Sequence, residues 1–128
     1  MRYTPIVIVV AVVALGALVF VQKPDQLSAN AETHRFAQIQ EAVIGGALLL
    51  DVRTPSEYAA GHIDGASNLP LQEIQSGALP NIGTDKTIYV YCQSGNRSAQ
   101  ATTILKKAGY TVEDLGGIED VVAIGGTL

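Results

Sequence analysis

The sequence predicts an α/β fold, in which a mainly parallel sheet is covered by helices on both faces. Four short runs rich in aliphatic, β-branched or aromatic residues have the composition of strands. Segments whose apolar residues recur at helical spacing lie between these runs, and regular alternation of strands with helices is typical of a covered parallel sheet. The region with this pattern, residues 34–128, is long enough for one hydrophobic core and too short for two.

The predicted elements follow one another along this region. A first helix is marked by Phe36, Ile39, Val43 and Ile44 and ends at Gly45 and Gly46. Strands are expected at Ala47–Val52, Ala66–Leu69, Thr87–Tyr91 and Thr111–Leu115. Short helices are expected at Ser56–Ala60, Leu71–Gly77, Ala99–Ala108 and Ile118–Ala123.

The single cysteine of the chain, Cys92, directly follows the strand predicted at Thr87–Tyr91. Small and polar residues then lead to Arg97 and to a helical pattern that begins at Ser98. A strand, a tight loop and a helix N-terminus in this order aim backbone N–H groups and the positive end of the helix dipole at one point. Such surroundings lower the pKa of a cysteine from about 8.5 to roughly 3.5–7.5. We therefore expect Cys92 to be a nucleophile rather than a small buried hydrophobe.

The segment CQSGNRS, residues 92–98, resembles the active-site loop of the rhodanese family. Upstream, LLLDVRTPSEYAAGHIDGASNLP resembles the second signature of that family, and DLGGI matches the stretch after its last strand. The similarity covers residues 34–126 and extends to the small periplasmic rhodaneses of the phage-shock type. It implies a rhodanese-like three-layer fold and a sulfurtransferase that needs no metal and no organic cofactor.

The resemblance also implies roles for the residues of this loop. Cys92 is expected to be catalytic and to hold a sulfane sulfur as a persulfide, taken from a donor such as thiosulfate and passed to a thiol or to cyanide. The substrate-binding residues are expected to be Gln93, Ser94, Gly95, Asn96, Arg97 and Ser98. Thiosulfate-preferring relatives often have a basic residue where this chain has Gln93. We therefore expect the pocket to attract a dianion less, which would make thiosulfate a surrogate donor.

Two other functions stay open as alternatives. One is a non-catalytic rhodanese-like module that binds a partner or carries persulfide passively, against which the intact cysteine and loop argue. The other is a cysteine-dependent phosphatase or arsenate reductase. Phosphatases separate the cysteine and the arginine by five residues and so make a cradle for phosphate, whereas four residues separate Cys92 from Arg97. The shorter loop and the lack of a second cysteine argue against this alternative.

Three polar residues near the predicted site are interpreted as structural. Asp51 and Arg53 lie at the end of a buried strand, whose carboxyl end faces the active site in an open α/β sheet, and charges at such places are usually paired. The resemblance places His62 in a structural motif of the family. We therefore expect His62 to be a hydrogen-bonded loop residue rather than a partner of Cys92.

A long apolar run precedes the domain. No residue from Ile6 to Val21 has a polar side chain, and as a helix this run would span roughly 24 Å, slightly less than the hydrocarbon thickness of about 30 Å. Residues 1–22 are therefore expected to be a signal-anchor or signal peptide that targets the membrane, and residues 23–33 a linker. The length of the run favours an anchor over cleavage after Ala31.

The distribution of charge gives the expected side of the membrane. Arg2 precedes the apolar run, so the positive-inside rule keeps the N-terminus cytoplasmic and makes the domain extracytoplasmic, which in a bacterium means periplasmic. The chain has eight Lys and Arg against twelve Asp and Glu, with a formal net charge of −4. A chain without a basic stripe is not expected to bind nucleic acid. The expected partners are a small sulfur donor, a thiol acceptor and the membrane.

Overall fold

The structure is a computed structural model that describes residues 24–128, with side chains from residue 31 on. The predicted signal segment, residues 1–22, lies outside the described residues. The described part begins with helix α2, Pro24–Ile44. None of its helices combines the length and the apolar character that a membrane crossing requires.

Four parallel strands form one sheet in the order β2-β1-β3-β4. The strands are β1 (Leu48–Asp51), β2 (Ser67–Asn68), β3 (Thr87–Cys92) and β4 (Thr111–Gly117). The helices that connect and cover them are α3 (Pro55–Ala60), α4 (Leu71–Gln75), α5 (Asn96–Lys107) and α6 (Ile118–Ala123). Each of the eight predicted elements of the sheet region is present, with small shifts at the ends.

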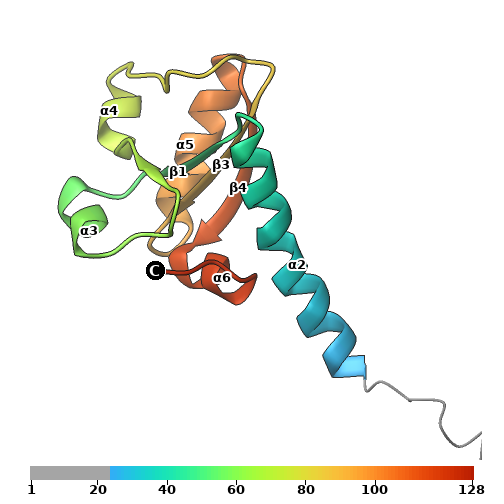
Figure 1. Cartoon of the computed structure of the whole chain (residues 1–128). Helices are drawn as coiled ribbons and strands as arrows, with labels where there is room; N and C mark the ends of the chain where they lie inside the picture. Colours follow the sequence, from blue (N-terminus) through green and yellow to red (C-terminus); the bar gives the residue numbers. More distant parts are fainter. Residues whose placement is uncertain (1–23) are drawn as a thin grey trace, which may run out of the picture.

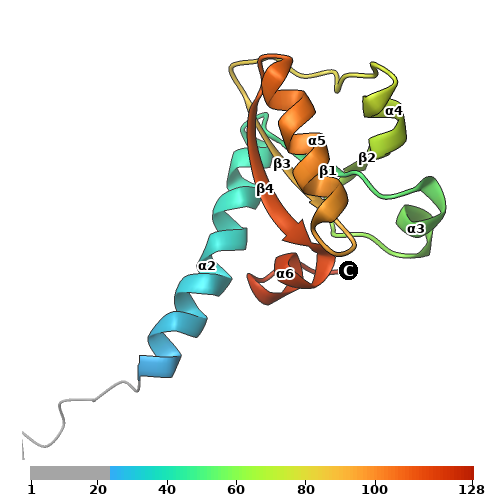
Figure 2. The same ribbon diagram turned by 180° about the vertical axis from the view of Figure 1, so that it is seen from behind.

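Helices cover both faces of the sheet, as the sequence predicts (Figures 1 and 2). Successive residues of a strand point to opposite faces, so each buried strand serves two cores. Leu50 and Val90 pack with residues of α4 and α5 in one cluster. Leu49 and Tyr91 pack with residues of α2 and α6 in the other. The domain therefore has three layers with the sheet in the middle.

Helix α2 is longer than the sequence pattern predicts. It begins at Pro24, so the segment predicted as a linker, residues 23–33, is helical from Pro24 on. Proline is tolerated in the first turn of a helix, where its missing N–H has no intrahelical partner, and the polar residues that follow are compatible with an exposed helix. At the other end, Phe36 and Ile39 are buried as expected, whereas Ile44 is exposed.

Candidate active site

The carboxyl ends of β1 and β3 meet in the middle of the sheet. From β1 the chain continues to β2 on one side, and β3 continues to β4 on the other. This reversal of strand order opens a crevice at the carboxyl ends, where open α/β sheets bind their ligands. Asp51 ends β1 and Cys92 ends β3. The fold thus brings both sequence signatures to one place.

The sulfur of Cys92 lies beneath the loop that follows it. The residue is fully buried, its Sγ accepts a hydrogen bond from the Gly95 N–H at 3.0 Å, and the Ser98 Oγ lies 3.6 Å away. Burial raises the pKa of the Cys92 thiol, but hydrogen bonds from the Ser98 hydroxyl and from the backbone N–H groups of Ser98, Gly95 and Ser94 outweigh it. The net pKa therefore lies below the ordinary value, and the thiolate is favoured.

Ser98 links the sulfur to the neighbouring strand. Its hydroxyl is fully buried and lies within hydrogen-bond reach of the carbonyl oxygens of Gly95 (3.0 Å) and Gly116 (3.3 Å), besides the Sγ of Cys92. A hydroxyl has one hydrogen to donate. Ser98 can therefore give this hydrogen to a thiolate, or to a carbonyl when the sulfur carries its own proton.

Gly116 and Gly117, the last two residues of β4, allow the Cys92 loop to lie close to that strand. Gly95, the N-cap residue before α5, has a φ of +95°, which a side chain disfavours. A Cβ on Gly117 would lie 2.8 Å from the carbonyl oxygen of Gln93, closer than such contacts allow. The segment DLGGI thus packs directly against the Cys92 loop through Gly116 and Gly117.

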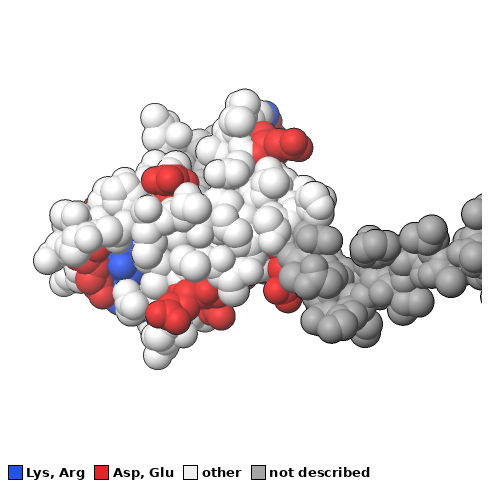
Figure 3. All heavy atoms as spheres, turned by 60° about the horizontal axis from the view of Figure 1, so that its bottom comes forward, with Lys and Arg blue, Asp and Glu red and all other residues white. Residues whose placement is uncertain are grey.

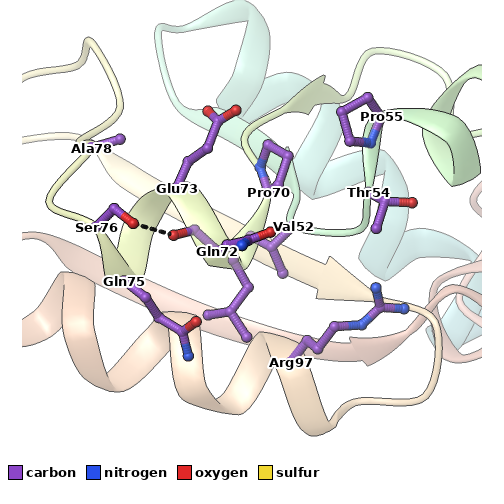
Figure 4. A pocket seen from close by; sticks show the side chains of 11 residues that line it. Val52, Thr54, Pro55, Pro70, Gln72, Glu73, Gln75, Ser76, Ala78 and Arg97 are labelled. Carbon is purple, nitrogen blue, oxygen red and sulfur yellow. Dashed lines mark hydrogen bonds between the residues drawn. The ribbon is translucent and has the colours of Figure 1, made fainter.

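Arg97 is paired with Glu57 on α3. Its Nη1 and Nη2 donate to the two carboxylate oxygens of Glu57 at 2.8 and 2.9 Å. In Figure 4 the side chain of Arg97 extends from the start of α5 toward Thr54. The hydrogen bonds from Arg97, and then those from Thr54, lower the pKa of Glu57 to about 2, and the same pairing raises the pKa of Arg97.

Glu57 lies at the candidate site but is not among the residues that the sequence analysis singles out. Its backbone N–H donates to the Thr54 Oγ1, and its carboxylate accepts from the Thr54 N–H, which makes a capping box at the start of α3. The pattern Thr54-Pro-Ser-Glu57 is the sequence signal for that box. The pairing with Arg97, forty positions away, has no local signal.

Asp51 and Arg53 form a buried ion pair. Their exposed fractions are 0% and 4%, and the guanidinium donates to both carboxylate oxygens at 2.7–3.0 Å. Arg53 also donates to the Gly61 carbonyl at 2.7 Å and to the Oε1 of Gln93 at 3.3 Å, and it lies over the ring of Tyr91. The pair thus connects the end of β1 to the loop after α3 and to the first residue after Cys92.

His62 is held by Tyr58. Its Nδ1–H donates to the carbonyl oxygen of Tyr58 at 2.8 Å, and the two rings stack with their centroids 3.7 Å apart. The Tyr58 hydroxyl donates in turn to the carbonyl oxygen of Ala66. These contacts give His62 the position of a hydrogen-bonded loop residue.

Two clefts flank the Cys92 loop. The larger, of about 840 Å³, lies between α4 and α5 and includes Val52, Thr54, Gln72, Glu73 and Arg97 in its lining (Figure 4). The smaller, of about 400 Å³, is lined by Arg53, Gly61, Gln93, Ile118 and Glu119 among others. Arg97 therefore faces the larger cleft and Gln93 the smaller, whereas Cys92 is buried.

The other loop residues differ in their surroundings. Ser94 is exposed and contributes its backbone N–H to the surroundings of the sulfur. Asn96 is the first residue of α5, and its Oδ1 accepts from Gln100 on the exposed side of that helix. The side chain of Asn96 is thus engaged away from Cys92.

Acidic side chains border the face of the molecule that carries the loop. Figure 3 brings this face forward and shows a small area of Lys and Arg (blue) next to Asp and Glu (red). Among the described residues, no group of three or more His, Cys, Asp or Glu side chains is arranged to hold a metal ion.

Comparison with known proteins agrees with this geometry. The model of the rhodanese-like domain family matches residues 25–123. This chain belongs to the rhodanese-like family. The rhodanese-like domain is 42% identical over 76 residues to the thiosulfate sulfurtransferase PspE of Escherichia coli, an alignment that covers 56% of this chain and 71% of PspE. It is 46% identical over 65 residues to YqhL of Bacillus subtilis and covers 51% of each chain.

A solved structure supports the same fold. The rhodanese-like domain matches a rhodanese of E. coli determined with anions, with a TM-score of 0.50 and 40% identity, over 58% of this chain and 89% of that one. The predicted parallel α/β rhodanese fold is therefore confirmed, and the family assignment supports a sulfurtransferase.

Proposed function

We propose that this rhodanese-like domain transfers a sulfane sulfur from a small donor such as thiosulfate to a thiol or to cyanide, through a persulfide on Cys92. The observation that carries the proposal is the hydrogen-bonded sulfur of Cys92. Gly95 and Ser98 place donors around the Sγ, and their hydrogen bonds hold its pKa below the ordinary value. A nucleophile prepared in this way is what covalent sulfur transfer requires.

In the first half-reaction the thiolate of Cys92 attacks the outer sulfur of thiosulfate. A new S–S bond forms on Cys92, the S–S bond of thiosulfate breaks, and sulfite leaves with the electron pair. The persulfide then carries one negative charge on its outer sulfur. Backbone N–H groups at the start of α5 stabilise such a charge without further rearrangement.

In the second half-reaction an acceptor removes the outer sulfur. Cyanide attacks it, the S–S bond breaks, thiocyanate leaves, and Cys92 recovers its thiolate and the electron pair. A thiol acceptor follows the same course and leaves as a persulfide. No redox partner is needed, since the sulfur that enters is the sulfur that leaves.

The test is a thiosulfate:cyanide assay with the wild-type protein and with Cys92→Ser. The substitution barely changes the volume of the side chain, so the fold should persist, as circular dichroism would show. We expect thiocyanate formation to fall below about a tenth of the wild-type rate, since the covalent intermediate is lost. A wild-type protein that forms no thiocyanate and no persulfide with any sulfane donor would instead favour the non-catalytic module.

We further propose that the domain acts outside the cytoplasm, anchored or released by residues 1–22. The support is the apolar run from Ile6 to Val21 with Arg2 before it. Fractionation of cells that express the full chain, with mass spectrometry of its N-terminus, would test both location and cleavage. Recovery in the soluble cytoplasmic fraction with an intact N-terminus would contradict the proposal.

A further inference from the structure

The cation of the Cys92 loop is neutralised in the folded protein. Arg97 is the only charged residue of CQSGNRS. Its guanidinium forms two hydrogen bonds to the carboxylate of Glu57, in a geometry that joins two donors to two acceptors. The side chains of the two residues are 32% and 33% exposed, so the pair lies at the edge of the site rather than in the core.

The other described cations do not compensate for this pairing. Arg53, the second arginine beside the loop, is bound to Asp51. Lys106 and Lys107 lie at the C-terminal end of α5, whereas the Cys92 loop lies at its N-terminal end. The two lysines are therefore about 15 Å from the loop along the helix axis. Lys86 lies before β3, whereas Cys92 ends that strand. Among the described residues, the positive charges nearest the sulfur are thus matched by carboxylates.

We propose that Glu57 is a specificity-determining residue, which neutralises Arg97 and so favours sulfur donors with a single negative charge, such as thiosulfonates and persulfides, over the thiosulfate dianion. This inference rests on the proposed sulfur transfer and extends it to the class of donor. It adds to the lack of a basic residue at Gln93, because Glu57 acts on the cation that the loop does have.

Glu57 offsets the positive charge of Arg97 without occupying all of its hydrogen-bond donors. An arginine has five N–H donors, and the pairing with Glu57 uses one from Nη1 and one from Nη2. Donors therefore remain for a bound ligand, while the net charge offered to that ligand falls toward zero. A second negative charge on the ligand then gains less than it would beside an unpaired arginine.

The chain allows a substitution that removes the charge and keeps the local structure. Glutamine serves at the third position of a capping box as glutamate does, so Glu57→Gln should preserve the start of α3. Its amide oxygen can still accept from Arg97. Glu73→Gln is the matched control. Glu73 is an exposed carboxylate that lines the same cleft, and its substitution removes the same single negative charge.

The experiment compares thiosulfate, a dianion, with benzenethiosulfonate, a monoanion, using cyanide as acceptor. Glu57→Gln should raise the ratio of kcat/KM for thiosulfate to that for benzenethiosulfonate by about five- to tenfold at low salt, and the gain should shrink at high salt. Glu73→Gln should leave the ratio within about twofold of wild type, since its charge is not paired with Arg97. An unchanged ratio in Glu57→Gln, or an equal rise in Glu73→Gln, would overturn the inference.

A second measurement separates this inference from the proposed function. Sulfate carries two charges and transfers no sulfur, so its protection of Cys92 from iodoacetamide reports dianion binding alone. Sulfate should protect Glu57→Gln at a several-fold lower concentration than wild type, and the double variant Glu57→Gln/Arg97→Ala should lose that gain. Equal protection in wild type and Glu57→Gln overturns the inference even where sulfur transfer is intact. Stronger protection in Glu57→Gln supports the effect of Glu57 on dianion binding, and a lack of thiocyanate from every donor would then count against the proposed sulfur transfer alone.

Discussion

At the scale of single residues, the reactivity of Cys92 is a balance between burial and hydrogen bonding. Burial opposes a charged sulfur, whereas the donors of Ser98, Gly95 and Ser94 favour it, and the donors prevail. Because the pKa is lowered, the thiolate persists to a lower pH than in an ordinary cysteine. The midpoint of the pH profile for alkylation by iodoacetamide should therefore lie below pH 8.5, the approximate pKa of an unperturbed thiol.

Ser98→Ala should raise the pKa of Cys92. The Ser98 hydroxyl is the leading group that lowers the pKa of Cys92, so its removal should move the alkylation midpoint to higher pH and slow alkylation at neutral pH. Thr103→Ala is the control, since the Thr103 hydroxyl lies on the exposed side of the same helix and donates to Ala99. A midpoint that stays in place in Ser98→Ala would show that backbone donors alone activate the sulfur.

Arg97→Ala should impair donor binding and thiolate formation together. It removes a positive charge near Cys92 and leaves the carboxylate of Glu57 unpaired, and both changes disfavour a negative sulfur. We expect a higher KM for thiosulfate and a loss of about 1.5–3 kcal/mol in transition-state stabilisation, as for a charge-assisted hydrogen bond. Steady-state kinetics and alkylation profiles would measure the two effects. Unchanged kinetics would mean that the guanidinium serves only to hold α3.

At the scale of elements, the site depends on how closely β4 approaches the Cys92 loop. Gly117→Ala would place a methyl group 2.8 Å from the carbonyl oxygen of Gln93 and 3.3 Å from the Cα of Ser94. Backbone has to move, so we expect stability to fall by about 1–3 kcal/mol and kcat/KM to fall further than stability explains. Gly45→Ala, at the end of α2, is a control outside the site. Normal turnover in Gly117→Ala would show that the loop adjusts freely.

The ion pair between Glu57 on α3 and Arg97 on α5 should also affect the pH dependence of the free energy of unfolding. The folded pKa of Glu57 is about 2, below its ordinary value of 4.5, so the pair contributes its full stability above pH 4.5 and loses it as the pH falls to about 2. Urea unfolding of wild type and Glu57→Gln should therefore differ most near neutral pH, and the difference should narrow over this range. A difference that is constant with pH would contradict the lowered pKa.

The elements themselves follow from local sequence pattern, whereas contacts between them do not. The run TIYVYC becomes β3 because its residues suit a strand buried on both faces, and the register that brings Asp51 level with Tyr91 follows from parallel pairing. The pairing of Glu57 with Arg97 depends on how α3 settles against the start of α5, which no local pattern encodes. The extension of α2 was missed because a polar segment with an initial proline has the composition of both a linker and an exposed helix.

At the scale of the whole molecule, the Asp51 and Arg53 pair joins parts of the fold that are distant in sequence. Arg53 reaches Asp51, the loop at Gly61 and the side chain of Gln93, while Asn68 at the end of β2 donates to the carbonyl oxygens of Asp51 and Arg53. These contacts lie at the point where the strand order reverses. The pair therefore supports the floor of the crevice in which Cys92 lies.

Asp51→Asn should destabilise the protein more than any change at the exposed pairs. It leaves the guanidinium of Arg53 buried without its counter-charge, and removal of one partner from a buried pair costs about 3–5 kcal/mol. The exposed pair of Arg35 with Glu113 is the contrast, because Glu113→Gln should cost at most about 1 kcal/mol. Urea unfolding followed by circular dichroism would measure both.

A double variant tests whether the ion pair of Asp51 with Arg53 stabilises the fold or instead positions the Cys92 loop. In Asp51→Leu/Arg53→Met no buried charge remains, and such apolar replacements are often neutral or stabilising. We expect it to recover much of the stability lost in Asp51→Asn but not the sulfur transfer, since the contacts of Arg53 to Gln93 and Gly61 are gone. Recovery of stability together with full turnover would show that Asp51 and Arg53 only fill space. Recovery of stability alone would show that the buried charges are needed to position the loop that carries Cys92.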